Sequence, residues 1–233
     1  MAETPYQTAL IVGAGHGLSA ALARVFARDG MRVALAARDI AKLAPLCAET
    51  GARAFACDAV DPAQVAALFA AVDGAIGAPE VVVYNASARA RGPVAELVPA
   101  EVERALMVSA YAGFLVAREA VIRMQPKAHG AVLFTGASAS VKGYPLSAPF
   151  AMGKFALRGL AQSMARELAP QGIHVAHFVI DGAIRNPGRV EPPDKPDSML
   201  DPAAIAATYL NVLHQPRSAW TWEVELRPWV ERF

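Results

Sequence analysis

The sequence of 233 residues is poor in charge and in cysteine. Only 18% of its residues are charged, and 22 basic against 21 acidic residues leave a formal net charge of +1. No block of one sign occurs, so the chain lacks the positive footprint that nucleic-acid or anionic-membrane binding needs. We therefore expect neither nucleic acid nor a membrane as partner, and the 55% hydrophobic content excludes a disordered chain.

Cys47 and Cys57 are the two cysteines of the sequence, and they form no CxxC pair. Neither cysteine nor histidine recurs at the spacing of zinc ligands, so we expect two reduced, buried thiols and no metal site. The first residues, MAETPYQ, lack the basic-then-apolar pattern of a secretory signal. No apolar run approaches the ~20 residues of a membrane span, and we expect a cytoplasmic protein.

Short β-favouring runs alternate with longer alanine-rich segments of helical period. This alternation is typical of βα units on a parallel sheet with helices on both faces, and the length fits a single domain spanning 1–233. Residues 186–201 hold four prolines and few apolar residues, so we expect a long flexible loop beside a substrate site. The expected strands are 8–12, 31–36, 53–56, 80–84, 131–135, 174–180 and 221–226, and the expected helices are 17–29, 40–50, 62–73, 99–124, 150–169 and 202–214.

A glycine-rich turn follows the first expected strand, with Gly13, Gly15 and Gly17 directly before Leu18 and the first expected helix. Glycines at this place let the backbone approach a pyrophosphate, whose charge the helix dipole and free N–H groups stabilise. Strand, turn, helix and second strand fall in the order of a dinucleotide-binding unit, so we expect a dinucleotide here. A tight turn without a ligand is the alternative.

The residue after the second expected strand selects between the two nicotinamide nucleotides. An acid there would bind the adenosine ribose of NAD, but the position holds Ala37, followed by Arg38. A guanidinium offers the 2′-phosphate of NADP(H) a planar fork of donors, and His16 would add a second donor. NADP(H) is therefore the preferred cofactor. Asp39 keeps NAD(H) possible, and a solvated surface role is the alternative for Arg38.

These motifs resemble those of the short-chain dehydrogenase/reductase family over nearly the whole chain. The family's TGxxxGxG turn is similar to the segment from Val12 to Ser19, with the leading Thr and the final Gly replaced. The resemblance implies a doubly wound Rossmann fold with a seven-stranded parallel sheet in the order 3-2-1-4-5-6-7. It also implies further cofactor contacts: Asp58 with adenine, Asn85 and Ala86 as counterparts of the family's NAG motif, and Gly182 and Ile184, which match its PG region, with the nicotinamide.

The family's main catalytic position is altered in this chain. Family members carry Tyr four residues before Lys on one helix; the Tyr exchanges a proton with the substrate oxygen, and the Lys lowers its pKa and holds the nicotinamide ribose. Here Lys154 is present, but Phe150 occupies the tyrosine position and can transfer no proton. We expect Ser138 to orient the substrate and Tyr144 to supply the proton, with a water on Lys154 as another source. A turn role for Ser138 and a packing role for Tyr144 are the alternatives.

The resemblance implies an oxidoreductase acting on a small carbonyl or alcohol with a non-standard catalytic centre. Two further family positions are changed, because Ala137 replaces the serine and Ser109 the asparagine. The alternatives are a catalytically silent nucleotide-binding protein with a sensing or assembly role, and a reductase of activated double bonds. Family members are commonly dimers or tetramers, so we expect a homo-oligomer in which the tail carrying Trp220, Trp222 and Trp229 packs against a neighbouring subunit.

Overall fold

Strand β1 (Thr8–Val12) is buried at all five positions, as an apolar strand covered by helices on both faces must be. A computed structural model describes residues 5–231 and places β1 inside a parallel seven-stranded sheet of order β3-β2-β1-β4-β5-β6-β9. The expected order 3-2-1-4-5-6-7 is confirmed, with β9 (Glu223–Leu226) as the seventh strand. The others are β2 (Arg32–Ala37), β3 (Arg53–Ala56), β4 (Val81–Tyr84), β5 (Gly130–Thr135) and β6 (Ile173–Ile180), each within one residue of its expected bounds.

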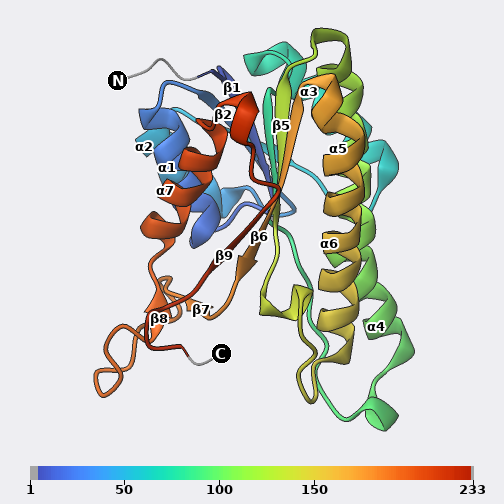
Figure 1. The fold of residues 1–233 in the computed structure, drawn as a ribbon, viewed down its shortest axis with the longest axis vertical. Coiled ribbons are helices and arrows are strands. Elements are labelled where there is room, and N and C mark those ends of the chain that lie inside the picture. The colour runs from blue at the N-terminus through green and yellow to red at the C-terminus, as the bar shows by residue number, and fades with distance from the viewer. Residues whose placement is uncertain (1–4, 232–233) are drawn as a thin grey trace.

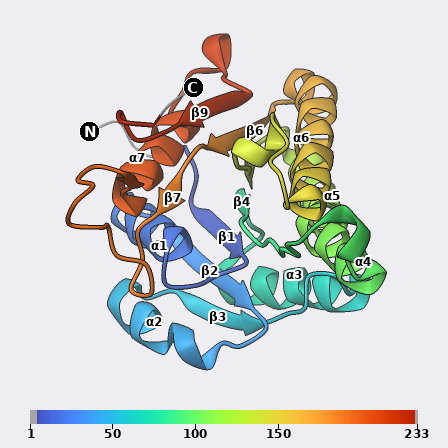
Figure 2. The same cartoon turned by 90° about the horizontal axis from the view of Figure 1, so that it is seen from below.

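Helices cover both faces of the sheet, so the expected α/β architecture is confirmed (Figure 1). Three helices pack on one face and three on the other, and each layer has its own apolar cluster. The view from below shows the sheet running from β3 through β1 to β9 between these layers (Figure 2). The first layer is α1 (Leu18–Arg28), α2 (Ala44–Thr50) and α7 (Pro202–Leu213); the second is α3 (Pro62–Ile76), α5 (Ala112–Met124) and α6 (Ala148–Leu168).

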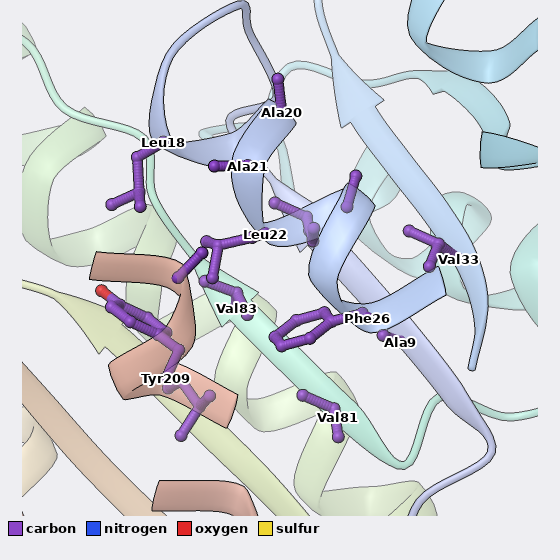
Figure 3. Packing of buried hydrophobic residues seen from close by; sticks show 14 of the residues in the cluster. Ala9, Leu18, Ala20, Ala21, Leu22, Phe26, Val33, Val81, Val83 and Tyr209 are labelled. Carbon is purple, nitrogen blue, oxygen red and sulfur yellow. The ribbon is translucent and has the colours of Figure 1, made fainter. Parts of the chain in front are cut away.

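Helix α1 is anchored to the sheet by large apolar side chains (Figure 3). Leu22 and Phe26 are fully buried in the cluster that also contains Val81, Val83 and Tyr209. Burying a side chain of this size contributes about 1.5–3 kcal/mol to folding. This packing holds the N-terminus of α1 at the carboxyl end of β1, where the glycine turn lies.

The segment 186–201 is bounded by regular structure that its sequence did not predict. Strand β7 (Ala183–Ile184) pairs in parallel with β8 (Met199–Leu200), which joins the two ends of the segment. Arg185 and Asp201 add an ion pair of 3.1 Å at the same place. In Figure 1 this ribbon lies below the seven-stranded sheet. The flexibility of the segment itself stays a prediction.

One helical stretch is long enough to cross a membrane, contrary to the sequence-based expectation. Helix α4 (Pro99–Leu106), a π-helical turn (Met107–Tyr111) and α5 form a continuous helical run. By length and apolar composition alone, Pro99–Lys127 could cross a membrane. Its residues Val116 and Ala120 are fully buried in the second apolar layer. One face of the stretch therefore packs into the core, while Phe114 and Ile122 on the same stretch are exposed.

Candidate active site

The glycine turn connects the carboxyl end of β1 with the first turn of α1. Within residues 5–231 no side chain caps this helix at Gly17, which leaves its first N–H groups open to an anion. A Cβ added to Gly15 would meet no atom within 4 Å, whereas one on Gly13 would lie 2.5 Å from the backbone nitrogen of Ala86. The turn thus has open space at Gly15 and is packed against the loop after β4 at Gly13.

Asn85, which follows β4, fixes the shape of this turn. Its Nδ2 donates a 2.7 Å hydrogen bond to Oγ of Ser19, and this hydroxyl donates to the carbonyl oxygen of Gly13 at 3.0 Å. The backbone N–H of Asn85 also donates to the carbonyl oxygen of Val12 at 2.9 Å. Ser19 was not among the predicted site residues, although its place in the first turn of α1 could have indicated this role.

A cavity of about 310 Å³, here called the central cavity, opens beside the glycine turn and the carboxyl ends of β5 and β6. The carboxyl edge of an open parallel sheet is where such folds bind their ligands. Residues from five separate parts of the chain meet there, which no local sequence pattern specifies. Of the predicted site residues, the lining contains Gly13, Gly15, Gly17, Leu18, Asn85, Ser138, Lys154, Gly182 and Ile184.

A second cavity, here called the outer cavity, adjoins the first, because Gly13 and Asn85 line both. It extends along the ends of β2 and β3 toward α4. The predicted adenosine-side residues Arg38, Asp58 and Ala86 all line it. The structure therefore places these three residues along one continuous crevice with the glycine turn.

His16 and Arg38 do not line the same cavity. His16 lines a neighbouring hollow together with Arg185, whereas Arg38 lines the outer cavity. Lys42, which sequence reasoning missed, lines both. Across residues 5–231 none of Arg38, Lys42 and Arg104, which all line the outer cavity, forms an ion pair, so three cations at this end of the crevice have no ion-pair partner.

Lys154 lies at the opposite end of the crevice and is only 3% exposed. Its Nζ donates a 2.7 Å hydrogen bond to the backbone carbonyl oxygen of Thr135. Burial, together with the nearby charge of Arg89, lowers the pKa of Lys154 to about 7. The amine therefore exchanges a proton near neutral pH.

Phe150 stands one helical turn before Lys154 and lines the same cavity. The Nζ of Lys154 lies 5.9 Å from the centre of its ring, and the guanidinium carbon of Arg89 lies 4.1 Å from the same point. The ring thus forms part of the cavity wall beside Lys154 and carries the guanidinium of Arg89 on its face. Sequence reasoning missed Arg89, since no pattern distinguishes it from a surface arginine.

The structure brings Ser138 but not Tyr144 to the central cavity. Ser138 begins a short 3-10 turn after β5 and belongs to the lining, whereas Tyr144 is outside it and 43% exposed. Lys142, on the same loop, forms a 3.3 Å ion pair with the buried carboxylate of Asp181. The catalytic roles of Ser138 and Tyr144 stay predictions.

Ser109 is fully buried in the π-helical turn and does not line the central cavity. Its Oγ lies 3.3 Å from the backbone nitrogen and 3.4 Å from the carbonyl oxygen of Ala88, accepting from the first and donating to the second. A Cβ added to Gly153 would lie 2.6 Å from the Cβ of Ser109, so α6 packs closely here. Ser109 therefore holds the loop after β4 rather than contacting a ligand.

A polar network that includes the buried His177 and the half-buried Arg158 and Glu223 lies behind the cavity wall. The Nδ1 of His177 lies 3.0 Å from Oε2 of Glu223, and Arg158 donates two hydrogen bonds of 2.6 and 2.7 Å to the same carboxylate. Burial lowers the pKa of His177 to about 4, although Glu223 opposes the shift. Gly136 lines the cavity in front of it, and a Cβ there would lie 2.3 Å from Nε2 of His177. The network joins β9, α6 and the rear of the cavity.

Two of the tryptophans near the C-terminus pack on side chains of the same chain. Trp220 stacks on His174 with ring centres 4.5 Å apart, and the guanidinium of Arg158 lies 5.5 Å from the ring of Trp222. Both are contacts within the chain that the sequence did not predict. The packing of this tail on a neighbouring subunit stays a prediction. Trp229 is 81% exposed.

Both cysteines are free thiols, as the sequence predicted. Cys57 is buried as expected, whereas Cys47 is only half-buried, because it lies at the edge of the first apolar layer. Burial raises the pKa of Cys57 to about 11, which makes this thiol unreactive at neutral pH. In the part of the chain that the structure describes, no three His, Cys, Asp or Glu residues are grouped to hold a metal ion.

The family model described as short chain dehydrogenase matches residues 7–188. The chain belongs to the short-chain dehydrogenase family. A solved short-chain dehydrogenase from Rhodopseudomonas palustris is 38% identical, with a TM-score of 0.82 over 96% of this chain and 99% of that one. A metagenomic short-chain oxidoreductase, solved in complex with NADP, is 28% identical, with a TM-score of 0.83 over 95% of this chain and 97% of that one.

Among curated proteins, inactive 2-(S)-hydroxypropyl-CoM dehydrogenase 2 of Xanthobacter autotrophicus is 33% identical over 156 residues. The match covers 66% of this chain and 68% of that protein. In this short-chain dehydrogenase the glycine turn, Asn85 and Lys154 face one cavity, while no tyrosine belongs to the described lining of that cavity.

Proposed function

We propose that this short-chain dehydrogenase is an NADP(H)-dependent oxidoreductase that interconverts a small carbonyl compound and its alcohol. The observation that carries the proposal is the position of Lys154, which lines the same cavity as the glycine turn at the uncapped N-terminus of α1. A cofactor pyrophosphate and a reacting carbonyl could therefore be held at two ends of one crevice. Membership of a dehydrogenase family and the NADP bound in the metagenomic relative support this function.

The residues present fit a phosphorylated dinucleotide. The open space at Gly15 admits a pyrophosphate, and the unpaired cations Arg38 and Lys42 suit a 2′-phosphate. Asp39 and Asp58 in the same lining suit a free ribose hydroxyl, which leaves NAD(H) as the second nucleotide. When bound, the nicotinamide ring would give or take the hydride.

Lys154 and Ser138 are the groups proposed to serve the substrate oxygen. The hydroxyl of Ser138 can donate a hydrogen bond to a carbonyl oxygen, and Lys154, with a pKa of about 7, can pass a proton to it through a water. Phe150 can do neither. The sequence analysis favoured Tyr144 as the proton source. Because Tyr144 lies outside the cavity, we now favour Lys154 for this role.

A catalytically silent nucleotide-binding protein is the second candidate, because Phe150 removes the family's proton donor while the nucleotide crevice is kept. A reductase of activated double bonds is the third, since its proton can come from elsewhere in the cavity. Both candidates keep the cofactor site and differ from the first at the substrate end, so cofactor binding and turnover have to be measured separately.

The test is a titration of the purified protein with NADPH and NADH, followed by NADPH oxidation with short ketones, aldehydes and enones. We expect NADPH to bind at least about tenfold more tightly than NADH, because charge-assisted hydrogen bonds contribute about 1.5–3 kcal/mol. Ketone-dependent oxidation of NADPH is the expected turnover. Binding of a nucleotide without NADPH oxidation would favour the catalytically silent protein. NADPH oxidation with enones but not with ketones or aldehydes would favour the double-bond reductase. Failure to bind either nucleotide would overturn the proposal.

We also propose a cytoplasmic homo-oligomer, a dimer or tetramer. Large apolar side chains are exposed on the outer surface of the second helical layer, which is unusual for a monomer. They come from two neighbouring helices and the π-helical turn: Tyr111, Phe114, Ile122, Met152 and Phe155.

A further inference from the structure

The central cavity carries positive charge without a counter-charge. Its described lining contains Arg89, Lys154 and Arg189 but no aspartate or glutamate. Across residues 5–231 none of the three forms an ion pair. The whole chain has a formal net charge of only +1, so this is a local concentration of charge. A cleft lined by one sign of charge attracts ligands of the opposite sign.

Arg89 is placed for a ligand at the substrate end of the cavity. Its guanidinium carbon lies 4.1 Å from the ring centre of Phe150, one helical turn from Lys154. Stacking on an aromatic face orients the planar guanidinium and leaves its N–H edge available for a bidentate acceptor. Loss of water around the guanidinium, and then the charges of Arg91 and Arg189, lower the pKa of Arg89. An anion beside Arg89 would relieve this repulsion.

Arg189 reaches the same cavity from the segment after β7. Its backbone N–H donates to the carbonyl oxygen of Asn186 at 2.9 Å, and the N–H of Asn186 donates back to Arg189 at 3.1 Å. The N–H of Gly188 donates to Oδ1 of Asn186 at 2.9 Å, which closes the turn. Two arginines far apart in the sequence are thus brought to one cavity by two separately fixed loops.

We propose that Arg89, assisted by Arg189, forms a subsite for a negatively charged group of the substrate, a carboxylate or phosphate carried near the reacting carbonyl. The inference rests on the proposed function, because Lys154 and Ser138 place that carbonyl. It narrows the substrate class to oxo acids or oxo phosphates and the corresponding hydroxy compounds.

The test is isothermal titration calorimetry of the protein saturated with NADP⁺. The probes are two matched pairs: 4-oxopentanoate with its methyl ester, and dihydroxyacetone phosphate with dihydroxyacetone. At least one anion should bind about tenfold or more tightly than its neutral partner, and the pair that shows the difference identifies carboxylate or phosphate. Arg89→Gln should bring that ratio close to one, and Arg89→Lys should retain part of it. Arg91→Gln, which removes a neighbouring charge outside the cavity lining, should keep the full ratio.

Equal affinities of both anions and their neutral partners for the wild-type protein would overturn the inference. An Arg89→Gln variant that loses NADP⁺ affinity as strongly as anion affinity would also overturn it, since Arg89 would then hold the cofactor's phosphates. Repeating the titrations without nucleotide, and assaying NADPH oxidation by the same probes, separates the two proposals. If the protein binds the anions more tightly than their neutral partners but oxidises no NADPH with them, the anion subsite is supported and the proposed oxidoreductase activity is contradicted.

Discussion

The Nζ of Lys154 donates its 2.7 Å hydrogen bond to the carbonyl oxygen of Thr135, the last residue of β5. The strand fixes the acceptor and α6 fixes the donor, so the position of the amine is set by the packing of two core elements. A backbone carbonyl carries only a partial negative charge, and it offsets only part of the cost of burying an ammonium. This is why the pKa of Lys154 falls to about 7 in spite of the bond.

The buried Lys154 should make the stability of the protein depend on pH. Its pKa is about 7 in the folded chain against 10.5 for an ordinary lysine, so the unfolded state binds more protons between these values. The free energy of unfolding should rise with pH across this window, by up to ~1.4 kcal/mol per pH unit from this residue. Lys154→Met should have a flatter profile, measured by denaturant unfolding at pH 7, 8 and 9 without nucleotide. Identical slopes would show that Lys154 titrates normally.

Phe150→Tyr should restore a proton donor beside Lys154. Positioned proton transfer contributes typically ~10²–10⁴-fold, and the value of kcat/KM for ketone reduction should rise by a factor in this range. Phe150→Leu is the matched control, because it removes the ring without adding a hydroxyl and should bring no gain. If the tyrosine variant is no faster than the wild type, the cavity is not built for carbonyl reduction.

Arg38 and Lys42 should determine the preference between the two nucleotides. Arg38→Gln and Lys42→Gln should each weaken NADPH binding roughly tenfold and leave NADH binding nearly unchanged, since only NADPH carries the 2′-phosphate. Fluorescence titration of both nucleotides measures this, with the exposed Arg166→Gln as a charge-matched control. Equal losses for NADPH and NADH would show that neither cation contacts the 2′-phosphate.

Ser138 and Tyr144 can be separated by one pair of variants. Ser138→Ala should lower kcat/KM by at least about tenfold, because it removes a hydrogen bond to the substrate oxygen. Tyr144→Phe should leave both the rate and the affinity for NADPH unchanged, since Tyr144 does not line the cavity. A Tyr144→Phe variant that binds NADPH normally but has lost its activity would return Tyr144 to the role of proton donor.

The apolar surface of α5 and α6 should be the subunit contact. Phe155 is 45% exposed there, and Phe155→Glu should shift the molecular mass in light scattering toward that of the monomer, 24.5 kDa. Val190→Glu places the same charge on an exposed residue of the 186–201 segment and should leave the mass unchanged. A wild-type protein that is already monomeric at micromolar concentration would contradict the proposal.

The sheet could be predicted from the sequence because each central strand is a short apolar run between turn residues. β5 and β6, for example, are buried at every position, and their short length, apolar composition and flanking turn residues locate them. The ribbon of β7 (Ala183–Ile184) and β8 (Met199–Leu200) was missed because two-residue strands leave no periodic signal. The tryptophan packing was missed because His174, the partner of Trp220, lies on another strand.

The cofactor side of the site was easier to predict than its substrate side. Gly13 to Leu18 form one continuous motif, so local order was enough to locate the turn. Arg89 and Arg189 come from two loops whose meeting depends on the tertiary fold, and an isolated arginine in a loop has no distinctive pattern. Tyr144 was favoured for its chemistry and its nearness in sequence, neither of which specifies where its side chain points.

The carboxylate of Glu223 ties the last strand to both His177 and Arg158, and Arg158 lies one turn beyond Lys154 on α6. A protease that clipped the chain ahead of β9 would remove this carboxylate and leave the buried imidazole of His177 and the half-buried guanidinium of Arg158 without their shared acceptor. The change would reach α6 one turn from Lys154, while the glycine turn near the other terminus stayed intact. Trimmed preparations should therefore lose turnover before they lose the ability to capture nucleotide.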